Sequence, residues 1–138
     1  MPASTYLGNM VLESVLRGLA FVEPTRVWVA LHTGNPGVDG LNEITAAIWT
    51  SYQRQDPALA GPMASGFDPA LAKTSSNAKQ MNFGEMDGLT DVQVTHASVW
   101  DSQTGGNMLL YGPLVTSRTF APTDEALIKV GKLTEAVI

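Results

Sequence analysis

The chain has 138 residues, of which 44% are hydrophobic and 15% are charged, with a net charge of −5 and no cysteine. This length suits one domain, so we expect residues 1–138 to share a single core. The absence of cysteine excludes disulfides, thiolate metal sites and a cysteine nucleophile. An average globular domain carries roughly 25% charged residues, so this low charge favours a surface that other proteins partly cover.

The distribution of charge argues against two kinds of partner. The eight basic residues are scattered singly along the chain, whereas a protein that binds nucleic acid directly needs clustered Lys and Arg. No stretch approaches the ~18 apolar residues of a membrane span, and the N-terminal residues lack the pattern of a secretory signal. We therefore predict a soluble protein that binds neither nucleic acid nor a membrane.

Residues 5–18 are the one good helix candidate. Ser4 or Thr5 can cap the start of the helix, and Gly18 is placed to end it after Arg17. Apolar residues recur every four positions and give the helix one apolar stripe. We expect this helix to cover an open end of a β core, with binding of a partner as the alternative.

After residue 24 the pattern changes to that of β-strands. The sequence predicts strands at residues 26–32, 48–55, 78–83, 92–101, 108–115, 118–120, 126–130 and 133–137. A loop at 34–40, a turn at 84–88 and a hairpin at 102–107 separate several of them. About seven or eight short strands with Gly and Pro at the turns indicate a mostly β sandwich or barrel.

Two details of the strands follow from the same patterns. In the strand at 92–101 we expect Val92 and Val94 on one face, with Ala97 and Val99 on the other. Pro113 lacks the amide hydrogen that a central strand needs, so it predicts a sheet edge or a bulge.

The stretch 56–77 is rich in proline, glycine and alanine, and it is too apolar for a plain linker. Long ordered loops in compact domains are often functional. We expect this loop and the loop at 34–43 to contact a neighbouring chain, with packing on their own domain as the alternative. The candidate contact residues are Asn35, Pro36, Leu41, Pro57, Leu59, Pro62, Met63, Phe67, Pro69 and Leu71.

The sequence offers little for catalysis. His32 and His96 are the only histidines, both lie in strand patterns, and no serine-nucleophile or phosphate-loop motif accompanies them. The acidic residues at 85–91 lack the spacing of a calcium loop, and two distant histidines make a poor zinc site. We therefore predict a non-enzymatic protein with no cofactor and no metal site.

The three tryptophans allow one further alternative. Trp28, Trp49 and Trp100 all fall in strand-like segments, where core packing is the expected role. If two of them were exposed, they could instead form the stacking platform of a carbohydrate-binding module.

Several tracts together resemble a known group of proteins. They are YLGNMVLESVLRG at 6–18, VWVALHT at 27–33 with Asn35 and Pro36, YQRQ at 52–55, VTHASVWD at 94–101 and TGGNMLLYGPL at 104–114. In this order they resemble small virion proteins of tailed bacteriophages, of the capsid decoration (cement) and tail-fibre-like kinds. The proline-rich stretch at 57–75 is longer than that group leads us to expect.

The resemblance implies a jelly-roll-like antiparallel β-sandwich with an N-terminal helix, present in many copies on a virion. A single domain without repeats favours a decoration protein that binds the major capsid protein on the outer surface of the shell. It would also bind itself as a dimer or trimer. A tail-fibre or baseplate component that binds a host receptor or a tail protein is the alternative.

Overall fold

The computed structural model describes residues 2–136 and is mostly β with one α-helix. In chain order the elements are α1 (Thr5–Arg17), β1 (Trp28–His32), η1 (Gly37–Asp39), η2 (Met63–Ser65), β2 (Thr74–Ser76), β3 (Met81–Glu85), β4 (Val92–Trp100), β5 (Met108–Phe120), β6 (Glu125–Ile128) and β7 (Thr134–Ala136), where η marks a short 3-10 helix. The predicted strand at 118–120 is part of β5. Residue 137, at the end of the last predicted strand, lies outside the described residues.

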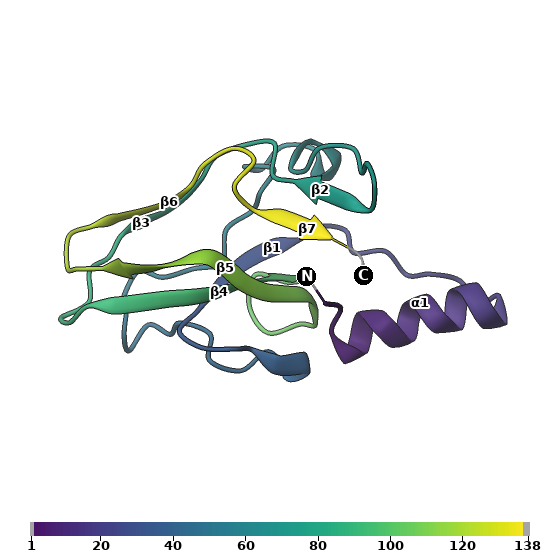
Figure 1. The fold of residues 1–138 in the computed structure, drawn as a ribbon, viewed down its shortest axis with the longest axis horizontal. Helices are drawn as coiled ribbons and strands as arrows, with labels where there is room; N and C mark the ends of the chain where they lie inside the picture. The colour runs from purple at the N-terminus through teal and green to yellow at the C-terminus, as the bar shows by residue number, and fades with distance from the viewer. Residues whose placement is uncertain (1, 137–138) are drawn as a thin grey trace.

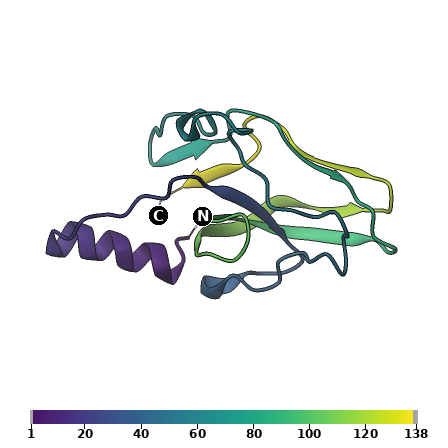
Figure 2. The same ribbon diagram turned by 180° about the vertical axis from the view of Figure 1, so that it is seen from behind.

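The described strands pair antiparallel in three small sheets. Strands β1, β4 and β5 form one sheet with β4 in its centre, while β2 pairs with β7 and β3 pairs with β6. Figures 1 and 2 show the two smaller sheets lying together on one side of the larger one. The prediction of a mostly β, antiparallel fold with an N-terminal helix is confirmed, whereas the jelly-roll-like sandwich stays a prediction.

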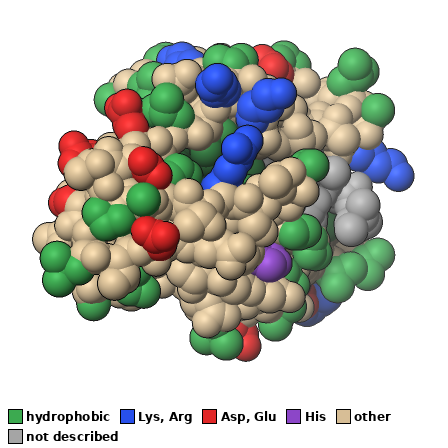
Figure 3. Space-filling model, turned by 60° about the vertical axis from the view of Figure 1, so that its left-hand side comes forward, with side chains coloured by type: hydrophobic (Ala, Val, Ile, Leu, Met, Phe, Trp, Pro, Cys, Tyr) green, Lys and Arg blue, Asp and Glu red, His purple; other side chains and the backbone are tan. Residues whose placement is uncertain are grey.

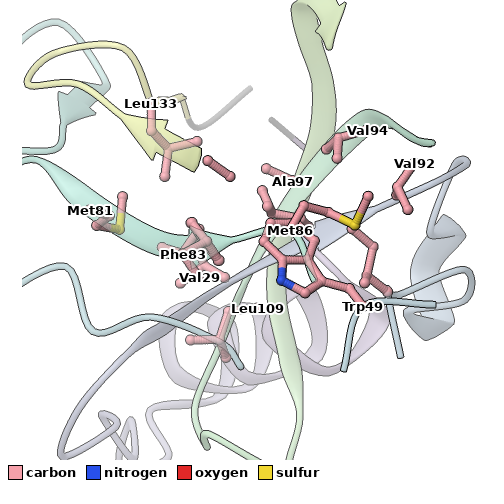
Figure 4. Close-up of a cluster of buried hydrophobic side chains, with 14 residues drawn as sticks. Val29, Trp49, Met81, Phe83, Met86, Val92, Val94, Ala97, Leu109 and Leu133 are labelled. Carbon is pink, nitrogen blue, oxygen red and sulfur yellow. The ribbon is translucent and has the colours of Figure 1, made fainter. Parts of the chain in front are cut away.

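The main hydrophobic core lies between these sheets and draws side chains from five strands (Figure 4). Trp49 is fully buried in it, and its indole nitrogen donates to the carbonyl of Glu85 at 3.1 Å. Its ring packs against Tyr52 and Phe120, with centroids 5.8 and 6.1 Å away. The indole therefore joins the end of β3 to the far end of β5.

The burial of Trp49 explains why the predicted strand at 48–55 is wrong. The chain there makes turns, with the amides of Ile48 and Trp49 donating to Thr45 and that of Tyr52 donating to Trp49. Only Gln55 forms a bridge, to β1. The pattern of apolar residues at 48–55 therefore reflects the burial of one large side chain, Trp49, and not a β-strand.

The faces of β4 also differ from the prediction. Val92, Val94, Ala97 and Val99 all belong to the same core cluster, although strict alternation places the two pairs on opposite faces. The pairing with β5 shifts register between residues 94 and 96, and such an irregularity reverses which side chains face the core. β5 is an edge strand and Pro113 is exposed on it, as predicted.

Asn77 is a buried polar residue that joins three segments. Its amide nitrogen donates to the carbonyls of Lys79 and Lys129 at 2.7 and 3.0 Å, and its side-chain oxygen accepts from the amide of Leu133 at 3.0 Å. The side chain thereby satisfies backbone groups that a strand ladder would otherwise pair. It ties the β2–β7 sheet to the β3–β6 sheet.

The hairpin predicted at 102–107 connects β4 to β5 and depends on its glycines. Asn107 donates its backbone and side-chain nitrogens to the carboxylate of Asp101 at 2.7 and 3.0 Å. Gly105 and Gly106 have φ of +60° and +71°. A Cβ on Gly106 would come within 2.4 Å of Asp101 and 2.6 Å of Ser102, so only glycine fits there.

Helix α1 has the predicted bounds and caps. The Ser4 hydroxyl accepts from the amide of Leu7 at 3.1 Å, and Gly18 ends the helix in the left-handed conformation with φ of +69°. The amide of Ser4 donates to the carbonyl of Leu109 at 2.8 Å, which ties the base of the helix to β5. Beyond this base α1 projects away from the sheets instead of covering them (Figures 1 and 2), so the expected covering role is wrong.

We predict that Trp49→Ala lowers the free energy of unfolding by about 3–5 kcal/mol, because it leaves a large cavity and removes a buried hydrogen bond. Leu89→Ala is the control, because Leu89 is 97% exposed and its loss is expected to change stability by less than about 0.5 kcal/mol. Urea unfolding followed by far-ultraviolet circular dichroism measures both. Equal midpoints for the two variants would contradict the assigned role of Trp49.

Candidate interaction surface

An open groove of about 960 Å³ lies between the base of α1, the chain that leads into β1, and the η2 region. Its lining is mostly apolar. The apolar side chains that matter most are Leu7, Val27, Met63, Phe67, Leu109 and Leu110. Several of them also pack against the main core, so the groove is an exposed extension of that core.

The charged groups of this groove have one sign. Glu23 and Asp68 are the only ionisable side chains among the described residues that line it. An apolar groove with two carboxylates suits an apolar segment that carries a positive charge.

The exposed apolar surface continues from the groove along α1. No residue of the helix is buried. Large apolar side chains stand at least one-third exposed from one end of the helix to the chain after it, namely Tyr6, Val11, Leu12, Val15, Leu16, Leu19, Phe21 and Val22. Val15 and Leu16 are each 74% exposed. Contiguous apolar surface of this kind marks a site of protein or membrane interaction.

The loop beside the groove is ordered by its own hydrogen bonds. The carboxylate of Asp56 accepts from the amides of Ala58 and Ala60 at 2.8 and 2.9 Å and forms an ion pair with Arg26. Leu59 and Ala60 both have positive φ, of +51° and +63°. Such strained backbone persists only where its surroundings hold it, and it is frequent at functional sites.

Most of the predicted contact residues are exposed, and two of them are buried. Asn35, Leu41, Leu59, Pro62, Met63, Pro69 and Leu71 are exposed, and Phe67 is half-buried. The structure brings together Met63, Phe67 and Pro69 in the groove. Pro36 and Pro57 are fully buried, so their assignment as contact residues is wrong. Both prolines shape their loops from the inside.

The apolar surface of the helix is wider than the sequence pattern predicts. That pattern gives one stripe of apolar residues, whereas Leu12 and Leu16 lie outside the stripe and widen the apolar arc. A helix that is apolar around most of its circumference is normally buried. That width, together with the apolar residues that follow Gly18, is the signal that could have identified the surface.

A buried arginine organises the hairpin between β4 and β5. The guanidinium of Arg54 is 6% exposed and donates to both carboxylate oxygens of Glu43, at 2.8 and 2.7 Å. It also donates to the carbonyls of Ser102 and Gly105, both at 2.8 Å. Its central carbon lies 3.7 Å from the ring centroid of Trp100. One side chain thus joins the loop before residue 44 to the β4–β5 hairpin.

His32 belongs to a second buried network. Its Nδ1 donates to the carbonyl of Leu41 at 2.8 Å, so its Nε2 accepts from the hydroxyl of Ser98 at 2.6 Å. That hydroxyl accepts from the indole nitrogen of Trp100 at 2.7 Å. Burial lowers the pKa of His32 and keeps the ring neutral. The pair of Ser98 and His32 has the spacing of a nucleophile and its base, but both side chains are 0% exposed, so substrate cannot reach them.

The tryptophans do not form a carbohydrate platform. Trp49 is 0% exposed and Trp100 is 8% exposed, with Arg54 over its ring, so only Trp28 reaches the surface in part. Among the described residues no three His, Asp or Glu side chains gather as metal ligands. Within the same residues, no helix has both the length and the apolar character to cross a membrane.

The chain matches a known protein family along nearly its whole length. Residues 2–136 match a family described as the podophage GP4 fiber I protein gp80. No curated protein matches the chain. The family match defines a phage structural protein, a component of the virion. More specifically, the chain belongs to the podophage GP4 fiber I protein gp80 family, because the match covers nearly its whole length.

We predict that Arg54→Met lowers the free energy of unfolding by about 3–5 kcal/mol, because the carboxylate of Glu43 loses its partner in a partly buried site. Arg54→Lys keeps the charge but not the planar fork, so an intermediate loss is expected. Arg118→Met, on an exposed stretch of β5, serves as the control and should change stability by less than about 0.5 kcal/mol. Urea unfolding measures all three, and a stable Arg54→Met protein would contradict the role given to Arg54.

We predict that stability falls as the pH drops below 6.5, because the pKa of His32 is lower in the folded chain than its ordinary value of 6.5. Protons then bind the unfolded chain preferentially, which costs up to about 1.4 kcal/mol per pH unit until the folded pKa is reached. Above pH 6.5 this contribution is fully present. Thermal melts of His32→Gln and His96→Gln between pH 7.5 and 5 test it. Burial lowers the pKa of His96 as well, although its side chain is only half-buried, so both histidines contribute to the slope. The slope should decrease more in His32→Gln than in His96→Gln.

Proposed function

We propose that this chain is a non-enzymatic structural subunit of the phage fibre, and that it acts by binding other protein chains through its apolar surface. The observation that carries the proposal is the uncovered α1 in a chain of a fiber protein family. A side chain such as Val15 or Leu16, 74% exposed, favours a covered position in the assembled particle.

The surface chemistry supports binding to protein and not to nucleic acid. Most of the face drawn in Figure 3 is neutral or apolar, with Lys and Arg side chains in the upper middle of the view and acidic side chains mainly on the left. Interfaces between proteins are depleted in charged residues at their centres. The strongest polar geometry of the chain, around Arg54 and His32, is buried and serves folding.

A capsid decoration role is the second candidate. The ordered loop at 56–77 presents Leu59 and Leu71, 55% and 79% exposed, as apolar contacts for a partner such as the major capsid protein. A protein that binds the assembled shell better than free subunits stabilises the shell by mass action. Contacts with two or more capsid subunits would add to one another through effective concentration.

The number of copies per particle distinguishes these two roles. Quantitative mass spectrometry of purified particles would compare this chain with the major shell protein, and gold-labelled antibodies would locate it. We expect a small number of copies at the tail. Hundreds of copies in a simple ratio to the shell subunit would establish the decoration role instead, and absence from the particle would overturn both.

A further inference from the structure

We infer that residues 34–41 form a lid that His32 holds shut at neutral pH and releases when the chain is acidified. The lid is the loop that follows β1, and it includes η1. Figures 1 and 2 show it in blue, on the side of the β1–β4–β5 sheet that faces away from the two smaller sheets. All of its contacts lie within one chain, so the lid does not depend on the proposed place of the protein in the virion.

One hydrogen bond joins the lid to the large sheet. Nδ1 of His32, in β1, donates to the carbonyl of Leu41 at 2.8 Å. Every other hydrogen bond of residues 35–41 among the described residues stays within the stretch 33–42, such as the bond from the amide of Leu41 to the carbonyl of Pro36. Loss of the His32 bond therefore leaves the lid held by packing alone.

The lid covers a small apolar cluster that is separate from the main core. Trp100 and Met108, 8% and 4% exposed, form this cluster with Ala30. Gly40 lies directly against it, because a Cβ on Gly40 would come within 2.6 Å of the Trp100 ring and 3.6 Å of the Met108 sulfur. The main core lies between the sheets, on the other side of the large sheet. The lid can therefore open as a local unit while that core stays packed.

The hydrogen bonds around His32 are complete only when its ring is neutral. Nδ1 then donates to Leu41, and Nε2 accepts from the hydroxyl of Ser98 at 2.6 Å. That hydroxyl accepts in turn from the indole nitrogen of Trp100 at 2.7 Å. A proton on Nε2 would force the hydroxyl to turn its own hydrogen away, and the hydroxyl makes no further hydrogen bond among the described residues. Protonation of the closed form therefore leaves a buried donor unpaired, which is costly.

The surroundings of the ring offer no free counter-ion for the added charge. His32 is 0% exposed. The carboxylate of Glu43 attracts a protonated ring, but it is already paired with Arg54, whose own charge opposes protonation. His96 lies directly opposite His32 in the β1–β4 pairing and also opposes it. The lid itself carries one ionisable side chain, Asp39, which is exposed to solvent.

The direction of the pH effect follows from these contacts. Burial holds the pKa of His32 in the closed form below its ordinary value of 6.5, whereas a ring that reaches water titrates near that value. Below pH 6.5 protons therefore bind the open form better than the closed form and shift the population towards it. Between pH 7.5 and pH 5 this linkage raises the ratio of open to closed chains by at most about 30-fold. The open form adds Trp100 and Met108 to the apolar surface that a partner can cover.

Thiol labelling tests the lid directly, because the natural chain has no cysteine. Met108→Cys places a thiol beneath Gly40, and Leu89→Cys, at a site that is 97% exposed, corrects for the pH dependence of the reagent, dithiodipyridine. We expect the labelling rate of Met108→Cys relative to Leu89→Cys to rise at least about fivefold from pH 7.5 to pH 5. Val94→Cys, in the main core, should stay protected. A constant ratio for Met108→Cys would overturn the inference, and an equal rise for Val94→Cys would replace lid opening with global unfolding.

Replacement of each histidine identifies the group that responds to pH. In the Met108→Cys chain, His32→Gln should remove the rise in labelling, because glutamine gains no proton in this range. His96→Gln should keep most of the rise, and circular dichroism checks that both variants fold. A full response in His32→Gln would contradict the latch.

Nuclear magnetic resonance of the unmodified chain gives a readout that needs no variant. The ring nitrogens of His32 should titrate over the same pH range in which the amide signals of Gly40 and Leu41 change. Protonation of His32 with no change in those two amides would show that the lid stays shut, and would overturn the inference.

Discussion

The buried guanidinium of Arg54 is the constraint on which much of this fold depends. A buried charge is tolerated only when it is paired and its hydrogen bonds are made. Arg54 meets that requirement by drawing together Glu43, two carbonyls of the 102–107 hairpin and the face of Trp100. These segments are far apart in the sequence. Their meeting holds the β4–β5 hairpin, and with it the central strand of the largest sheet, in one register.

The same arrangement decides where the chain is free to bind. Polar groups in the Arg54 and His32 networks bond to one another inside the protein and hold the fold. Next to the β4–β5 hairpin, α1 is attached at its base, through Ser4 and Leu7, and carries its apolar side chains outward. A firm β framework with an uncovered apolar helix suits a subunit of a larger protein assembly. Membership of a phage fiber family agrees with that design.

Local signals explain which predictions were confirmed. The bounds of α1 follow from Ser4 and Gly18, which act on backbone groups within one helical turn. The hairpin follows from two glycines that alone accept the required backbone angles. Predictions that needed distant partners failed. Residues 48–55 turn inward because Trp49 packs in the core, and both valine-containing pairs of β4 reach the same core across an irregularity in its pairing with β5.

The sequence by itself determined the mostly β class, the single helix and the scarcity of charge, because periodicity, caps and turn residues act over a few positions. It also placed Met63, Phe67 and Pro69 among the candidate contacts. Only the tertiary structure decided that these residues share a groove with Leu7, and that Pro36 and Pro57 are buried. The exposure of α1 was decided in the same way. An apolar stripe has the same pattern whether the helix packs on its own core or on another chain, and only the completed packing of the β-sheets shows which surface is left uncovered.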